Sequence, residues 1–93
     1  MAVIWKETLQ PTDRQTVELP VDAEILCAAE QGDDICIWFR TRPTSVKGPR
    51  QIAIYGTRHP APDADMGRYL GTAFLRGGSL VFHVFEPVLG GRA

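Results

Sequence analysis

Hydrophobic residues along this chain gather in short runs, and turn-forming residues interrupt these runs roughly every ten to twelve positions. Inside the runs apolar and polar residues alternate, which is the period of a β-strand, and no 3.6-residue helical period is sustained. The pattern predicts seven strands, at residues 2–9, 16–19, 24–30, 35–42, 51–57, 69–76 and 79–85. We therefore expect an all-β fold, a small antiparallel barrel or sandwich of six to seven strands, in which any helix is one turn within residues 63–67.

Glycine and cysteine positions refine two of the predicted hairpins. Gly77-Gly78, between the last two strands, is typical of a tight turn because glycine tolerates positive φ. Cys27 and Cys36 flank the turn expected at residues 30–33, and a hairpin centred there would place the two cysteines opposite each other. Two cysteines without C-x-x-C spacing do not make a metal site, so we expect two small, buried and reduced side chains.

The two faces of the predicted strands differ in chemistry. In the fourth strand, Phe39 belongs to an aliphatic and aromatic face, whereas Trp38 and Arg40 lie on the opposite face. The fifth and seventh strands divide in the same way and carry Tyr55 and His83 opposite their aliphatic residues. A sheet with one solvated face would carry plainer polar residues there, so the pattern indicates a contact surface.

Seven aromatic or cationic residues form the candidate ligand-binding set. They are Trp38, Arg40, Arg42, Tyr55, Arg58, His59 and His83. Alternation is expected to place the strand residues side by side on one surface, where rings stack on a base and guanidinium groups hold its phosphates. The same surface also fits a subunit interface with arginines at its rim. Both interpretations stay open, because binding sites often form between subunits.

The stretch at residues 55–62 is the densest in functional groups. Gly56 permits close backbone approach, and Thr57, Arg58 and His59 supply hydrogen-bond donors. The prolines that follow hold such a loop extended and stiff. The stretch is therefore either part of a binding site or a rigid crossover between strands.

The charges are divided along the chain, although the net charge is only -1. Residues 1–39 hold eight acids and two bases, whereas residues 40–76 hold seven bases and two acids. This pattern suits binding of an anion or of a complementary copy, so we expect a homo-oligomer. General nucleic-acid binding is not expected, because its proteins present a strongly basic face.

Composition and motifs limit the number of domains, the cellular location and the kinds of function that we expect. Ninety-three residues suit one domain, residues 1–93, with a core at about 2–87 and a flexible tail at 88–93. We expect a cytoplasmic protein without membrane contact, because no apolar run spans a bilayer and no secretory-signal pattern is present. Phosphate-loop, metalloprotease and nucleophile-elbow motifs are missing, which predicts no catalytic residues, no cofactor and no metal site.

Several sequence blocks resemble a known family when they are read in order. They are Ile-Trp-Lys at 4–6, Leu-Pro at 19–20, Tyr-Gly-Thr-Arg-His-Pro at 55–60, Tyr-Leu-Gly-Thr at 69–72 and Gly-Ser-Leu-Val-Phe-His-Val-Phe at 78–85. The chain resembles a family of short proteins, frequent in bacteriophages and prophages, that is described only as a domain of unknown function. The resemblance implies a phage-encoded accessory protein in the host-cell cytoplasm and transfers no catalytic residue.

Three functional hypotheses follow from these observations. The first is a non-catalytic protein that sequesters a small anionic, nucleotide-like ligand, such as a host-defence signal, through the candidate set. The second is an inhibitor that binds a host protein through the same face or through the acidic half. The third is a small enzyme acting on a nucleotide, with Tyr55, His59 and His83 as the residues to replace first.

Overall fold

The structure, a computed structural model, describes residues 1–87, and the tail predicted at 88–93 lies outside the described residues. Seven strands and one 3-10 turn form the fold: β1 (Val3–Leu9), β2 (Arg14–Pro20), β3 (Glu24–Gln31), β4 (Asp34–Thr41), β5 (Lys47–Gly56), β6 (Arg68–Leu75), η1 (Arg76–Gly78) and β7 (Leu80–Glu86). Each strand overlaps one predicted range, so the all-β fold class is confirmed. No helix among residues 1–87 is long and apolar enough to cross a membrane.

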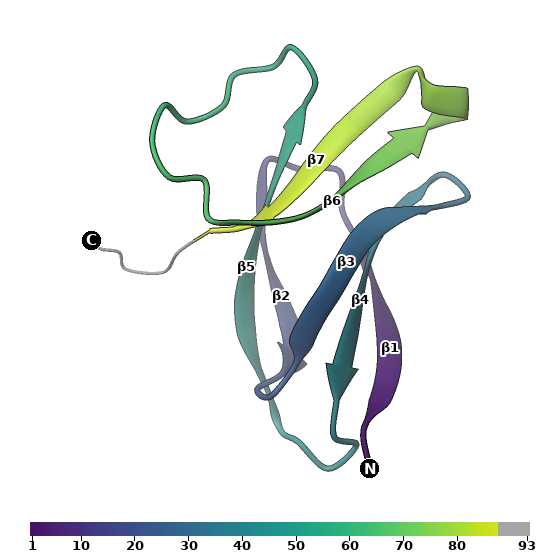
Figure 1. Cartoon of the computed structure of the whole chain (residues 1–93), viewed down its shortest axis with the longest axis vertical. Helices are drawn as coiled ribbons and strands as arrows, with labels where there is room; N and C mark the ends of the chain where they lie inside the picture. Colours follow the sequence, from purple (N-terminus) through teal and green to yellow (C-terminus); the bar gives the residue numbers. More distant parts are fainter. Residues whose placement is uncertain (88–93) are drawn as a thin grey trace.

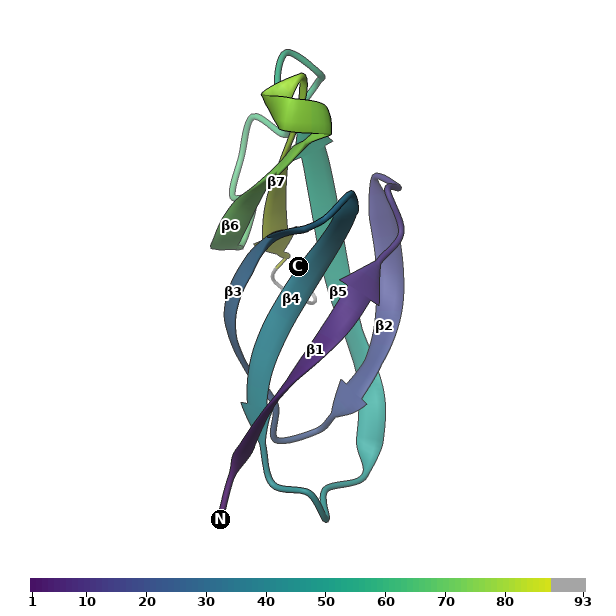
Figure 2. The ribbon, with the colours of Figure 1, turned by 90° about the vertical axis from the view of Figure 1, so that its right-hand side faces the viewer.

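The seven strands belong to one strongly curved sheet in the order β1-β4-β3-β6-β7-β5-β2 (Figures 1 and 2). The sheet is nearly closed into a barrel, and its two edge strands are β1 and β2, which a short link joins in sequence. All neighbouring strands pair antiparallel except β3 and β6, which pair in parallel. The end of the barrel that carries η1 and the start of the β5–β6 loop is called the upper end, as drawn in Figure 1.

Alternating side chains from every strand fill the interior. Ile37 and Phe39 of β4 are buried with Ile52 and Ile54 of β5, and Val84 of β7 is fully buried between them. These are the aliphatic faces predicted from alternation, and their burial supplies the main stabilisation of such a small domain. The opposite faces of β4, β5 and β7 therefore point outward, as the period of a strand requires.

The parallel contact between β3 and β6 is the weakest join in the sheet, since a single residue pair, Ala28 and Gly71, connects the two strands. Side chains continue the connection on both sides of this pair. The Arg68 guanidinium donates to the carbonyl oxygen of Ile25 at 2.7 Å, and the Glu30 carboxylate accepts from the backbone N–H of Phe74 at 2.9 Å. Hydrogen bonds from these two polar side chains thus replace the backbone hydrogen bonds that the two diverging strands do not form.

An ion pair lies at the lower end of the barrel interior. Arg50 of β5 donates to both carboxylate oxygens of Glu86 in β7, at 2.6 and 3.1 Å, and to the carbonyl oxygen of Ala23 at 2.9 Å. The two side chains are 22% and 19% exposed. One guanidinium therefore joins three segments of the chain.

Two predicted turns differ in the structure. Residues 63–67 are not helical, because the Asp65 carboxylate accepts a hydrogen bond from the Gly67 N–H at 2.8 Å and Gly67 takes a φ of 88°. The Gly77-Gly78 hairpin is wider than the tight turn expected. Arg76 also takes a positive φ there, so the last paired residues are Leu75 and Leu80.

The β3–β4 hairpin also corrects the expected cysteine arrangement. Gly32, with a φ of 61°, sits in a turn that pairs Gln31 with Asp34, so the hairpin centre lies one residue later than predicted. Cys36 consequently faces Ala29, and Cys27 faces Trp38. Both cysteines are free, and Cys36 is buried, but the prediction of burial is wrong for Cys27, which is exposed.

Candidate functional site

The seven predicted ligand-binding residues fall into two groups on different parts of the barrel. Trp38, Arg40 and Arg42 belong to β4 and the residue after it, whereas Tyr55 and His83 lie on paired strands β5 and β7. Strands β3, β6 and β7 separate β4 from β5 in the sheet. The expectation that Trp38 and Tyr55 lie side by side is therefore wrong, because alternation defines faces but not the order of strands.

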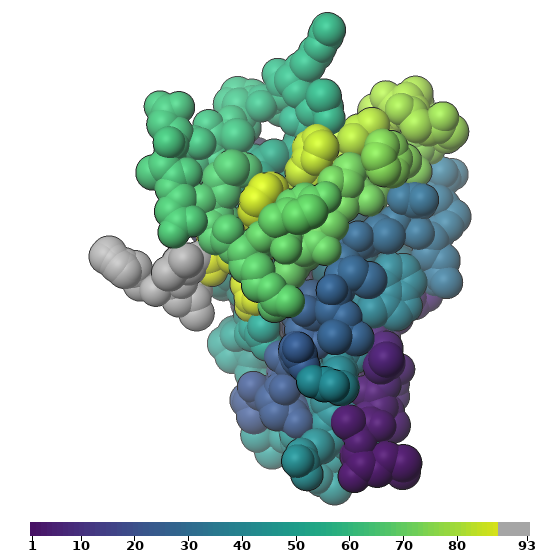
Figure 3. Space-filling view, viewed as in Figure 1, coloured from purple at the N-terminus to yellow at the C-terminus, as the bar shows by residue number. Residues whose placement is uncertain are grey.

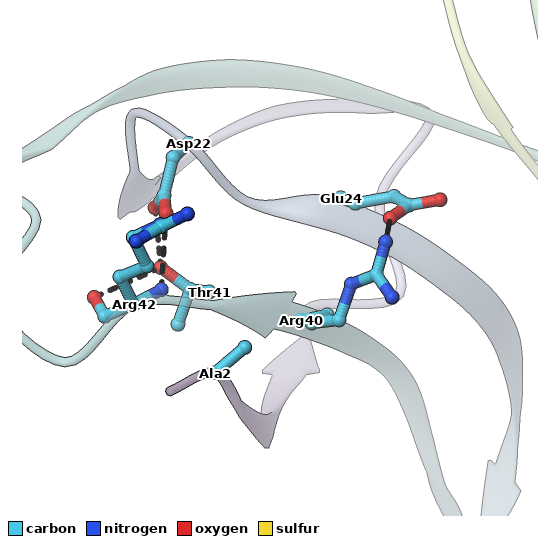
Figure 4. Close-up of a pocket in the computed structure, with 6 residues that line it drawn as sticks. All are labelled: Ala2, Asp22, Glu24, Arg40, Thr41 and Arg42. Carbon is cyan, nitrogen blue, oxygen red and sulfur yellow. Dashed lines mark hydrogen bonds and ion pairs between the residues drawn. The ribbon is translucent and has the colours of Figure 1, made fainter.

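In the β4 group, the structure already provides a partner for the charge of Arg40. Arg40 forms an ion pair with Glu24 of β3, and Trp38 is half-buried between paired neighbours on β1 and β3. Figure 4 shows the hollow beside these residues, lined by two arginines and two carboxylates, those of Asp22 and Glu24. Such a mixed lining does not favour an anion.

Asp22 connects the β2–β3 turn to the end of β4. Its carboxylate accepts from the Thr41 hydroxyl at 2.5 Å and from the backbone N–H of Arg42 at 3.0 Å (Figure 4). These bonds, with one from Ser45, lower the pKa of Asp22 from 3.8 to about 2, and the bond from Thr41 has the largest effect. The role of this carboxylate is structural, since its oxygens already accept from three groups.

The β5 and β7 group is connected by hydrogen bonds on the outer face. Tyr55 and His83 are directly paired across the two strands. The His83 ring contacts two hydroxyl groups, that of Thr57 from Nε2 at 2.8 Å and that of Thr72 from Nδ1 at 3.2 Å. Thr72 in turn bonds the Tyr69 hydroxyl at 2.5 Å. Both nitrogens of His83 are therefore occupied, and the ring fixes the positions of its neighbours.

Aromatic rings cover the lower part of the same outer face. The ring of Phe85 lies between those of Tyr55 and Tyr69, at centroid distances of 5.8 and 5.4 Å. Tyr69 and Phe74 of β6 are each about half exposed. The candidate set omitted Tyr69 because its proximity to Tyr55, through Phe85, depends on the pairing of β6 with β7, which no local pattern indicates.

A strained turn follows β5 at the upper end. The N–H of His59 donates to the carbonyl oxygen of Gly56 at 3.0 Å, which closes a turn with Arg58 at a φ of 75°. The His59 ring packs over Gly56 so closely that a Cβ there would lie 2.6 Å from Nδ1. A positive φ is costly for arginine, and such strain is concentrated at functional sites.

A hollow of about 330 Å³ opens beside this turn. It is lined by Gly56, Thr57, Arg58, His59, Ser79, Leu80, Val81 and Phe82. Its lining combines one guanidinium, one imidazole and two hydroxyl-bearing side chains with an apolar floor from β7, and it includes no carboxylate. Figure 3 shows the β5–β6 loop, in green, standing out from the barrel next to β7, in yellow. We call this hollow the Arg58 site.

Arg58 also differs from half of the six other bases in the basic half. Arg40 and Arg50 form ion pairs with acids, and Arg68 binds a carbonyl oxygen. Among residues 1–87, Arg58 forms no ion pair and no side-chain hydrogen bond. Its charge is therefore available to a ligand. The ion pair of Arg40 with Glu24, by contrast, neutralises a base of the basic half with an acid of the acidic half inside one copy.

A second hollow of about 250 Å³ lies on the other side of His59. It is lined by Asp13, Arg14, Ile54, Tyr55, Gly56, His59 and Pro60. Here a carboxylate accompanies the guanidinium, so the Arg58 site is the better match to an anion. Of the predicted residues, the structure brings together Tyr55, Arg58, His59 and, through Thr57, His83. The contribution of Ser79 to Phe82 was not predicted, because it depends on the register of β7 against β5.

Fold and site together define a small all-β barrel with an open, cation-bearing hollow at its upper end. The chain belongs to a family described as a domain of unknown function (DUF7352), whose model matches residues 1–91. Neither a curated protein nor a solved structure matches the chain.

Proposed function

We propose that this protein is a non-catalytic binding protein that sequesters a small anionic, nucleotide-like ligand in the Arg58 site. The observation that carries the proposal is the composition of that hollow, in which Arg58 and His59 meet an apolar floor and no carboxylate competes. A guanidinium pairs with phosphate through two parallel hydrogen bonds, and the apolar floor suits a flat ring. The volume suits a ligand no larger than a mononucleotide.

The strain at Arg58 supports the same proposal. Glycine would adopt a φ of 75° without cost, yet this position carries the longest cationic side chain. Because that side chain is already held at the mouth of the hollow, it loses less conformational entropy when a ligand binds. The resemblance to phage and prophage proteins adds the biological setting of the proposal, an accessory protein in the host cytoplasm that removes a nucleotide signal of host defence.

Calorimetric titration with inorganic phosphate and the four nucleoside 5′-monophosphates tests the proposal. We expect binding of at least one nucleotide, and Arg58→Ala is expected to weaken it by about 1.5–3 kcal/mol, or roughly 10- to 150-fold. Arg40→Ala is the matched control, because Arg40 is also exposed to solvent but is paired with Glu24, and three strands separate β4 from β5. Equal affinity of Arg58→Ala and the unmodified protein would refute the site.

A specific observation also favours the second hypothesis, an inhibitor of a host protein. Tyr69 and Phe74 expose about half of their surface on the outer face of β6, and Tyr69 lies next to the ring of Phe85. Exposed aromatic residues with a polar rim are typical of protein interfaces. Here Phe74→Lys would abolish capture of the host protein while Arg58→Ala would not, which separates the two functions.

A further inference from the structure

Strand β1 presents an unpaired backbone edge. It pairs with β4 through seven consecutive residue pairs, without a bulge, and is the last strand of the sheet on that side. Ile4 and Trp5, whose side chains point to opposite faces of the strand, are 60% and 48% exposed. A regular strand with a free row of N–H and C=O groups and large apolar residues on both faces is a template for another strand.

The other edge strand, β2, lacks these properties. Its outward positions carry Arg14, Thr16 and Glu18, its apolar residues Val17 and Leu19 are buried, and it ends at Pro20. Charged side chains and proline are the usual protection of an edge against pairing. β1 also carries Lys6 and Glu7, but it alone combines exposed apolar residues with a strand free of proline, and it is therefore the edge suited to strand addition.

We propose that β1 pairs antiparallel with β1 of a second copy, so that two barrels form a dimer with one continuous sheet. The proposal goes beyond ligand binding and does not depend on the Arg58 site. A second copy is the occupant because a strand edge is complementary to itself under a two-fold axis. The polar residues of β1 then select one register.

That register places Trp5 opposite the partner's Trp5. Ile4 then lies opposite the partner's Lys6, whose aliphatic stem covers it, and Val3 lies opposite the partner's Glu7. A shift by one residue would exchange the inner and outer faces. A centre at Lys6 would pair more residues but would oppose two like charges, which destabilises a strand pair.

Disulfide trapping tests both the edge and the register. In a Cys27→Ser background, which leaves only the buried Cys36, we expect Trp5→Cys to form a covalent dimer on mild oxidation. Glu7→Cys is the matched control on the same face of the same strand. In the proposed register, position 7 lies ~14 Å from its copy, too far for a disulfide. Cross-linking of Glu7→Cys in preference to Trp5→Cys would overturn the register.

Analytical ultracentrifugation of the otherwise unmodified protein, without ligand, tests the dimer itself. We expect a dimer at micromolar concentration, and an increase of at least tenfold in its dissociation constant for Trp5→Lys, while Thr16→Lys on β2 leaves it unchanged. Circular dichroism of each variant verifies that the barrel is folded. A monomer at 100 µM, or a dimer that Phe74→Lys breaks and Trp5→Lys does not, would overturn the proposal.

Discussion

Gly71 in β6 lies so close to Ala28 in β3 that a Cβ at position 71 would sit 1.9 Å from the Ala28 carbonyl oxygen. This contact is the single residue pair that joins the two parallel strands. The β1-β4-β3 part of the sheet and the β6-β7-β5-β2 part are therefore held in one sheet at a point that only glycine can occupy.

Replacing this glycine is expected to destabilise the whole fold. Gly71→Ala puts a methyl group into the backbone of β3, so the strands have to separate, at a cost of roughly 2–3 kcal/mol in the free energy of unfolding. Urea denaturation measures the change. Gly48→Ala is the control, because its Cβ meets only the exposed side chain of Val21, at 3.1 Å. Equal losses for both variants would contradict the proposed role of the contact.

Glu30 is expected to protect one specific backbone amide. Its carboxylate accepts the N–H of Phe74, and this bond is the main cause that lowers the pKa of Glu30. In Glu30→Gln, an amide oxygen replaces the charged acceptor, and hydrogen exchange at the Phe74 amide should become roughly tenfold faster. Amides in the centre of β4 provide the internal reference, since global opening exposes them and the loss of one side-chain bond does not.

Removing one partner of the Arg50–Glu86 ion pair should destabilise the fold more than replacing both partners by apolar residues. Glu86→Gln leaves the largely buried Arg50 without its charge partner and is expected to cost about 1–3 kcal/mol. The double variant Arg50→Met/Glu86→Leu should recover part of this loss, because apolar residues fill the same space. Thermal unfolding of Arg50→Met, Glu86→Leu and the double variant measures the coupling, and simple additivity would show that the pair contributes no specific interaction.

Asp22 makes stability depend on acid pH. Its pKa is about 2 in the folded chain and near 3.8 without its partners, so its contribution is complete above the higher value. The contribution is lost as pH falls from about 4 to 2, because protonation removes the charge that Thr41 and Arg42 stabilise. In Asp22→Asn, the acid-dependent loss between these values should be smaller than in the unmodified protein. Urea midpoints at pH 5, 3.5 and 2 measure it.

Alternation in the sequence predicted the seven strands and the inward faces of β4 and β5, whereas the expected burial of Cys27 was wrong. Ile37 and Phe39 point inward because successive side chains of a strand point to opposite faces, as the alternation predicted. Turn chemistry located every link, but with errors of up to four residues, the largest at the start of β5, which begins at Lys47 and not at residue 51. At Gly32 the error was one residue. A shift of one residue in that turn was enough to change the partner of Cys36.

The neighbours of each strand were decided by tertiary structure alone. Trp38 and Tyr55 carry the same pattern of outward aromatic residues, yet β3, β6 and β7 lie between their strands. The Arg58 site likewise depends on β7 residues, which are far from β5 in the sequence and are brought next to it by the fold. Local sequence fixes the faces of a strand because its period is a property of the backbone. The order of the strands depends on contacts such as Ala28 with Gly71, which form between distant residues only in the folded chain.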